Sequence, residues 1–134
     1  MTRKGRTVGI NASLIEAVRK MNKFNIGSVV VVDTDRERLV GILTERDVLK
    51  SIVSYLELSM IKVKQVMSHP LITIDAQENI EEAAKMMTAK GLKRLPVTED
   101  SRLVGIITSS DIMRASPTLV NTLMDILKSR VIRA

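Results

Sequence analysis

The chain has 134 residues, one domain's worth, and 45% of them are hydrophobic, which is enough to bury a genuine core. No apolar run approaches the ~18–20 residues of a membrane span, and no apolar stretch follows the basic start of the chain, so we expect a soluble cytoplasmic protein without a membrane partner. The net charge is +6, cysteine is absent and His69 is the single histidine, which excludes disulfides, thiolate metal sites and cysteine nucleophiles.

The first half of the chain predicts a short strand, a helix, a β-hairpin and a second helix. Apolar residues at helical spacing predict the first helix over residues 14–25. The β-branched run over 29–32 and the apolar run over 39–43, separated by a charged turn, predict a hairpin of buried strands. Thr44 then begins a helix that we expect to end at about Val53.

The second half predicts the same order of elements. We expect a helix over 80–90 with Gly91 at its C-terminal stop, then a hairpin over 94–98 and 103–107, then a helix over 109–114. Both first helices begin with a capping-box pattern, in which a Ser or Asn oxygen accepts an amide and a Glu side chain bonds back: Ser13–Glu16 and Asn79–Glu82.

The two halves also repeat each other in sequence. Leu39–Lys50 aligns with Leu103–Arg114 at an offset of 64, and six of the twelve pairs are identical. Upstream, the offset is 66 and the alignment runs without a gap to Val31 and Val97. Each copy, of the form β-α-β-β-α, is too small to cover its own sheet, so we expect the copies to pack on each other. The predicted parts are a first repeat, a linker, a second repeat and a C-terminal helix with an apolar stripe: residues 1–53, 54–66, 67–116 and 117–134.

The strongest duplicated motif is Gly-x-x-Thr-x-x-Asp, which carries Thr44 and Asp47 in the first repeat and Thr108 and Asp111 in the second. One interpretation is structural, because Thr at the N-cap with Asp three residues later is close to a capping box, and an acidic group suits the start of a helix. The other is functional, because a carboxylate and a hydroxyl beside free backbone amides can hold a ribose while the helix terminus faces phosphates.

The duplicated motif and the strand Arg94-Leu95-Pro96-Val97 resemble a tandem pair of CBS domains, the module named after cystathionine beta-synthase, over almost all of residues 1–114. The resemblance implies an α/β (α+β) fold in which two β-α-β-β-α repeats pack sheet to sheet about a pseudo-twofold axis and leave two clefts, and a homodimer of such pairs. It implies a regulatory sensor, not an enzyme, that binds an adenosine-containing ligand such as AMP, ADP, ATP or S-adenosylmethionine, with no cofactor and no metal. We expect an effector protein of unknown identity to read the change that the ligand causes.

Carried over position by position, the resemblance assigns ribose hydroxyls to Asp47 and Asp111, and the ribose or a phosphate to Thr44 and Thr108. Weaker candidates lie at the strands before each first helix, where the adenine pocket is expected, and in the first turn of the later helices, where a side chain can reach phosphate: Thr7, Val8, Thr73, Ile74, Arg46, Ser109 and Ser110.

The second repeat carries a further group of candidates. By the resemblance, Arg94, with Lys93 beside it, faces the phosphates. Pro96 lacks an amide, which interrupts strand pairing and leaves backbone groups free for an adenine edge. The equivalents in the first repeat are neither basic nor proline: Gly27, Ser28 and Val30. The two clefts should therefore be unequal, and we expect the Asp111 cleft to bind anionic nucleotides better.

Two other functions stay open from the sequence. The net charge and the cluster Arg3, Lys4 and Arg6 admit a nucleic-acid-binding protein, although basic and acidic residues are interspersed and no recognition motif is present. A structural dimerisation module with empty clefts is the second alternative, because capping alone explains why Asp and Thr stand in both copies. A hydrolase or transferase is the least favoured class, since no nucleophile–base pair or metal cluster can be assembled around His69.

Overall fold

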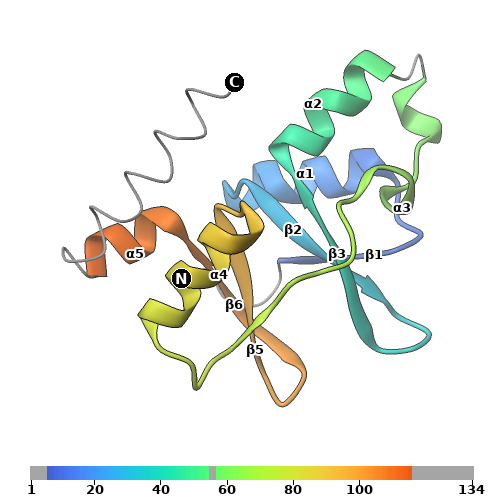
Figure 1. Ribbon diagram of the computed structural model, residues 1–134. Helices are drawn as coiled ribbons and strands as arrows, with labels where there is room; N and C mark the ends of the chain where they lie inside the picture. The colour runs from blue at the N-terminus through green and yellow to red at the C-terminus, as the bar shows by residue number, and fades with distance from the viewer. Residues whose placement is uncertain (1–5, 55–56, 116–134) are drawn as a thin grey trace. The chain divides into compact units, whose positions relative to one another are not determined.

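The structure, a computed structural model, describes residues 6–54 and 57–115 (Figure 1). The helix expected over 117–134 and the basic residues Arg3 and Lys4 lie outside the described residues. Among the helices of the described part, none has both the length and the apolar character required to cross a membrane.

Backbone contacts divide the chain into two compact units, with the division between Ile72 and Thr73. The first unit holds a three-stranded sheet of order β1-β2-β3, in which β1 runs parallel to β2 and β2 antiparallel to β3. The elements of the first unit are β1 (Thr7–Gly9), α1 (Leu14–Phe24), β2 (Ser28–Asp33), β3 (Arg38–Thr44), α2 (Glu45–Ser54), the 3-10 helix η1 (Leu58–Met60) and α3 (Val63–Val66).

The second unit repeats this plan with a sheet of order β4-β5-β6, again parallel and then antiparallel. Its elements are β4 (Ile74–Asp75), α4 (Ile80–Lys90), β5 (Arg94–Glu99), β6 (Arg102–Thr108) and α5 (Ser109–Ala115). The β-α-β-β-α order expected for each repeat is confirmed, and so is the mixed α+β class.

Helices α1 and α4 begin and end where the sequence predicts. The side chain of Ser13 accepts a hydrogen bond at 3.1 Å from the amide three residues later, and that of Asn79 accepts the equivalent bond at 2.8 Å. In the described residues, neither helix has the return bond from Glu that would complete a capping box. At the other ends, Gly91 (φ 72°) and Asn25 (φ 52°) adopt the left-handed conformation that stops a helix.

The two hairpins share an irregularity at the same place. In β2–β3 the register shifts between Val31 and Val32, and in β5–β6 it shifts between Val97 and Thr98. These positions correspond at the offset of 66 seen in the sequence. Because a β-bulge re-aims the strand that follows it, the equivalent bulges give the strand ends that carry the Thr-x-x-Asp motif the same local geometry.

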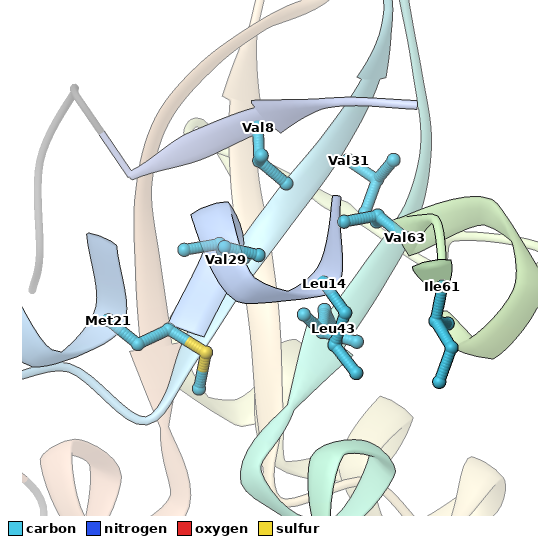
Figure 2. Close-up of a cluster of buried hydrophobic side chains, with 9 residues drawn as sticks. Val8, Leu14, Met21, Val29, Val31, Leu43, Ile61 and Val63 are labelled. Atoms are coloured by element: carbon cyan, nitrogen blue, oxygen red, sulfur yellow. The ribbon is translucent and has the colours of Figure 1, made fainter. Parts of the chain in front are cut away.

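The core of the first unit lies between α1 and its sheet (Figure 2). Val29 and Val31 of β2 have no exposed surface, as expected for alternate residues on the covered face of a strand. Ile61 and Val63, which the sequence analysis assigned to a linker, are 3% and 0% exposed and belong to the same core. The remaining core residues come mainly from α1 and the neighbouring strands: Val8, Leu14, Ala17, Met21 and Leu43.

The segment from Ile61 to Ser68 is therefore a built part of the first unit. The carbonyl of Ile61 accepts a hydrogen bond from the amide of Leu14 at 2.8 Å. Ser68 exchanges two backbone hydrogen bonds with Ile42 of β3, at 3.0 and 2.8 Å. The first residues of the predicted second repeat thus pack on the first unit, and the contact boundary falls six residues later than the predicted one, after residue 72 rather than 66.

Candidate functional site

Thr44 and Asp47 form a complete capping box at the junction of β3 and α2. The amide of Thr44 donates to Oδ2 of Asp47 at 3.0 Å, and the amide of Asp47 donates to Oγ1 of Thr44 at 3.3 Å. The Thr44 hydroxyl also donates to Oδ2 of Asp47, at 3.1 Å. These reciprocal bonds satisfy amides that an isolated helix start leaves without partners.

Thr108 and Asp111 repeat the two backbone-to-side-chain bonds of this arrangement at the junction of β6 and α5. The amide of Thr108 donates to Oδ2 of Asp111 at 2.9 Å, and the amide of Asp111 donates to Oγ1 of Thr108 at 3.1 Å. The structural interpretation of the motif is therefore confirmed in both units. In each unit, the capping box occupies Oδ2 and fixes the direction of the second oxygen, Oδ1.

The two Oδ1 atoms have different partners. Oδ1 of Asp47 accepts a hydrogen bond from the hydroxyl of Ser68 at 3.1 Å, and the same hydroxyl lies 3.1 Å from Oδ2. Oδ1 of Asp111 pairs with the guanidinium of Arg114 at 2.5 Å. The Arg114 side chain is 71% exposed and the Asp111 side chain 23% exposed, so this is a rim ion pair that costs little to open.

The surroundings of Asp111 favour its ionised form. Burial by itself raises the pKa of this carboxyl, but it is outweighed by lowering effects, of which the hydrogen bonds from the backbone and side chain of Thr108 are the largest and the charge of Arg114 is another. The pKa of Asp111 therefore lies below its ordinary value of 3.8. At neutral pH the group is a carboxylate that accepts hydrogen bonds and donates none.

The β5–β6 ladder brings Arg94 beside the second capping box. Arg94 is the register partner of Thr108, and the carbonyl of Lys93 accepts a hydrogen bond from the amide of Ser109 at 2.8 Å. Arg94 is half-buried and Lys93 is exposed. The first unit has the same backbone arrangement without the cations, since its equivalents there are Ser28, opposite Thr44, and Gly27, whose carbonyl accepts from Glu45 at 3.1 Å.

Pro96 shortens the parallel pairing in the second unit. In the first unit Thr7 pairs with Val30, whose amide donates to the carbonyl of Arg6 at 2.9 Å. Pro96 stands at the position of Val30 and has no amide to donate. The β4–β5 pairing accordingly begins one position later, at Ile74. The interruption expected from the sequence is confirmed, and one backbone acceptor loses its strand partner.

The other site residues predicted from the sequence differ in how far they are buried. Val8 and Ile74 are 4% and 6% exposed, so both side chains are buried, and Val8 belongs to the core of the first unit. Arg46 and Ser110, in the first turns of α2 and α5, are exposed. Two threonines and one serine are half-buried at the same strand and helix ends: Thr7, Thr73 and Ser109. A ligand role for these residues stays a prediction.

Two residues at the carboxylates were not among the sequence candidates. Ser68 lies 21 positions from Asp47 in the chain, and only the register of the 67–68 segment on β3 brings it there. Arg114 stands three residues after Asp111, a spacing that places two side chains on neighbouring positions of a helix. That spacing was a usable signal for Arg114, and the sequence held no comparable signal for Ser68.

His69 is exposed and directly follows Ser68. Within the described residues, no group of three or more His, Cys, Asp or Glu side chains is arranged to hold a metal ion. The contacts described above involve a carboxylate, hydroxyls, a guanidinium and backbone groups, which together suit hydrogen bonding to a polar organic ligand.

Two copies of one small α+β module, each ending its hairpin in the same capped carboxylate, define a duplicated-module protein. The family model for the CBS domain matches this chain twice, over residues 1–54 and 63–118. The chain belongs to the CBS-domain family. The resemblance stated from the duplicated motif is thereby confirmed.

Known proteins similar to the chain are themselves CBS-domain proteins or contain related regions. An uncharacterized protein of Methanopyrus kandleri is 37% identical over 116 residues, which are 85% of this chain and 59% of that protein. Inosine-5'-monophosphate dehydrogenase of Methanocaldococcus jannaschii is 37% identical over 81% of this chain, which spans only 21% of the enzyme. The chain thus matches a part of that enzyme and about three fifths of the Methanopyrus protein.

Solved structures confirm the fold. A conserved CBS-domain protein of unknown function from Thermoplasma acidophilum has a TM-score of 0.82 and 30% identity, covering 97% of this chain and 72% of that one. A CBS-domain protein from Pyrobaculum aerophilum, solved in complex with AMP, has a TM-score of 0.74 and 22% identity, covering 83% of this chain and 85% of that one. At that identity, the second likeness concerns the fold.

Proposed function

We propose that the chain is a regulatory module that binds adenosine-containing nucleotides at Asp47 and Asp111. The observation that carries the proposal is the duplicated capping box. In each unit the cap uses Oδ2 of the aspartate, and Oδ1, at the end of the hairpin, is paired with a side chain that a ligand can replace. An ionised carboxylate oxygen accepts hydrogen bonds strongly, and the hydroxyls of a ribose are suitable donors. The AMP complex of the Pyrobaculum protein supports this ligand class for the fold.

Arg94 would contribute to binding of the phosphates. It begins β5 directly opposite Thr108, so a nucleotide whose ribose is bound by Asp111 has a guanidinium within the same unit. Guanidinium groups bind phosphate oxygens in pairs, which favours nucleotides over nucleosides. Since Ser28 stands at the equivalent place in the first unit, we propose that the Asp111 site binds anionic ligands more tightly.

Pro96 would favour an amino-bearing base. Because residue 96 supplies no amide, the carbonyl that would pair with it is available to accept a hydrogen bond. Adenine presents an exocyclic amino group, which donates, whereas guanine and hypoxanthine present an oxygen at the same ring position, which does not. We therefore expect adenine nucleotides to be preferred over guanine or hypoxanthine nucleotides.

The module would act on a separate effector protein through the change that the ligand causes. The match to inosine-5'-monophosphate dehydrogenase covers only 21% of that enzyme. The described site residues supply hydrogen-bond donors and acceptors, which suit ligand binding. We infer a sensor and not an enzyme.

A thermal-unfolding panel tests the proposal. AMP, ADP, ATP, S-adenosylmethionine, NAD and GTP are each added at fixed salt to the wild type and to Asp111→Ala. A ligand at 100 times its Kd adds about 2.7 kcal/mol to the free energy of unfolding, which shifts the midpoint by several degrees. We expect an adenosine ligand to raise the midpoint of the wild type and to lose much of that effect in Asp111→Ala.

The matched control is Asn79→Ala, which removes a helix cap in the same unit and leaves the carboxylates intact. Loss of such a cap costs about 0.5–2 kcal/mol, so it reproduces the destabilisation that Asp111→Ala causes through its own cap. A ligand shift that persists in Asn79→Ala and becomes much smaller in Asp111→Ala assigns the second site. Absence of any shift in the wild type contradicts the proposal and favours the dimerisation or nucleic-acid alternatives.

A further inference from the structure

The hydroxyl of Ser68 donates to the carboxylate of Asp47. Its Oγ lies 3.1 Å from Oδ1 and 3.1 Å from Oδ2. Oδ2 already accepts the amide and the hydroxyl of Thr44, whereas Ser68 is the donor found on Oδ1 among the described residues. An alcohol on a carboxylate oxygen is the same interaction that a sugar hydroxyl would make there.

Ser68 is held at this place by its backbone. It exchanges two hydrogen bonds with Ile42 of β3, and its neighbour Met67 packs over Gly41. A Cβ atom at residue 41 would lie 2.7 Å from Sδ of Met67 and 2.8 Å from the carbonyl oxygen of Ser68, so only glycine permits the contact. Rotation of the Ser68 side chain alone would release the carboxylate, because the residue is exposed and its backbone bonds do not involve the hydroxyl.

The second carboxylate has a partner of different chemistry. Asp111 pairs with Arg114, a cation that stays attractive to a phosphate-bearing ligand after its carboxylate partner is taken. Ser68 offers no such compensation, because its hydroxyl and a ribose hydroxyl compete for one acceptor.

We propose that Ser68 is an internal competitor at the Asp47 site: its hydroxyl fills the position of a ribose hydroxyl and has to rotate away before a nucleotide binds. This inference rests on the proposed function and adds a specificity-determining residue to it. Ser68 therefore lowers the affinity of the first site relative to the second, so that the two sites fill at different ligand concentrations.

The test isolates the first site by calorimetric titration of AMP into Asp111→Ala and into Asp111→Ala combined with Ser68→Ala. We expect the second protein to bind AMP about threefold to tenfold more tightly, the range that loss of one competing hydrogen bond gives. Ser59→Ala is the matched control, because Ser59 is another exposed serine that donates to a carboxylate, that of Glu57 at 2.7 Å. The control is expected to leave the affinity unchanged.

A second ligand separates competition from a general change in the protein. The gain from Ser68→Ala should vanish with 2′,3′-dideoxyadenosine monophosphate, which lacks the hydroxyls that compete with Ser68. A gain that is equal for both ligands, or an affinity for AMP that is unchanged or weaker in Ser68→Ala, overturns the inference.

The outcomes also separate this inference from the proposed function. If the wild type binds AMP at Asp111 but Asp111→Ala combined with Ser68→Ala binds none, the inference fails together with the proposed site at Asp47, while nucleotide binding at Asp111 stands. If the wild type and all variants bind none of the adenosine ligands, the proposed function fails and the inference with it.

Discussion

Arg94 lies directly opposite Thr108 in the β5–β6 ladder, at the register where Ser28 lies opposite Thr44 in β2–β3. The two units therefore share a backbone frame at this point, and the first unit lacks the cation that stands beside the capping box of the second. This difference makes the ligand preferences of the two sites separable by substitution.

Arg94→Ser gives the second unit the residue of the first. We expect ATP binding to weaken about tenfold, the effect of losing one charge-assisted hydrogen bond, while adenosine binding changes little because adenosine has no phosphate. Calorimetric titration with both ligands measures the difference. Arg102→Ser, at the opposite end of the same hairpin, is the control and should bind ATP as the wild type does. An equal loss of affinity for ATP and adenosine would contradict the assignment of Arg94 to phosphate binding.

Gly41→Ala tests the contact between β3 and the 67–68 segment. The added methyl group meets Met67 and a backbone oxygen of Ser68, and we expect a loss of about 1–3 kcal/mol in the free energy of unfolding. Gly9→Ala is the control, since a Cβ there has nothing within 4 Å, and it should change stability by less than about 0.5 kcal/mol. Urea denaturation measures both. Equal effects of the two substitutions would mean that the segment does not lie on β3 in solution.

Asp111→Asn tests the charge on the second carboxylate. The pKa of Asp111 is lowered on folding, so its contribution to stability is present above the ordinary value of 3.8 and is lost as the pH falls through the lowered pKa. The wild type should therefore exceed Asp111→Asn in stability at pH 7, and the excess should shrink toward zero once the pH is below both values. Denaturation curves from pH 7 to acid pH give the excess. An excess that stays constant over this range contradicts the assignment.

Pro96→Val restores an amide to β5. We expect the new amide to pair with the preceding segment as that of Val30 does in the first unit, so that the hydrogen of the new amide exchanges slowly. The preference for AMP over IMP should fall at the same time, because the new amide removes an acceptor for the amino group. Ile106→Val, a conservative change in the paired strand, is expected to keep the preference. An unchanged AMP-to-IMP ratio in Pro96→Val would contradict the base-recognition proposal.

The homodimer implied by the family resemblance is also a prediction. Helix α2 exposes Leu49 (64%), Ile52 (52%) and Val53 (88%) on one face, and a twofold contact allows such a face to cover itself. Light scattering should give twice the chain mass of 14.9 kDa for the wild type and the single mass for Ile52→Glu. Met60→Glu removes an exposed apolar residue outside α2 and should remain dimeric. A monomeric wild type contradicts the prediction.

Local spacing predicted the order of the elements and the caps at Thr44 and Thr108, because both depend on residues close together in the chain. At Ser13 and Asn79 the predicted side-chain cap is present, but the described residues lack the return bond from Glu that was also predicted. Thr44 and Asp47 are three positions apart, so their residue types predicted either a helix cap or a ligand site, and the structure confirms the cap. The interrupted strand pairing at Pro96 could also be predicted, because proline lacks an amide hydrogen whatever the fold. The offset of 66 then identified Val30 as the equivalent residue in the first repeat, with which Pro96 can be compared.

The contact of Asp47 Oδ1 with Ser68 required the folded chain. Ser68 reaches Asp47 only because Ser68 pairs with Ile42 and glycine at residue 41 leaves room for Met67. Because the predicted second repeat begins at residue 67, nothing in the sequence indicated that Met67 and Ser68 contact the first unit. The burial of Val8 and Ile74 also comes from the folded chain, and the ligand role that the family resemblance suggests for them stays a prediction.

Calorimetric titration of AMP into the wild type, Asp47→Ala, Asp111→Ala and the double variant shows whether the capped carboxylates bind the nucleotide. We expect two binding events in the wild type, with the tighter one lost in Asp111→Ala, the weaker one lost in Asp47→Ala and neither present in the double variant. Asn79→Ala should retain both. Binding of AMP to the double variant with wild-type affinity and stoichiometry would contradict the claim that the capped carboxylates form the nucleotide sites.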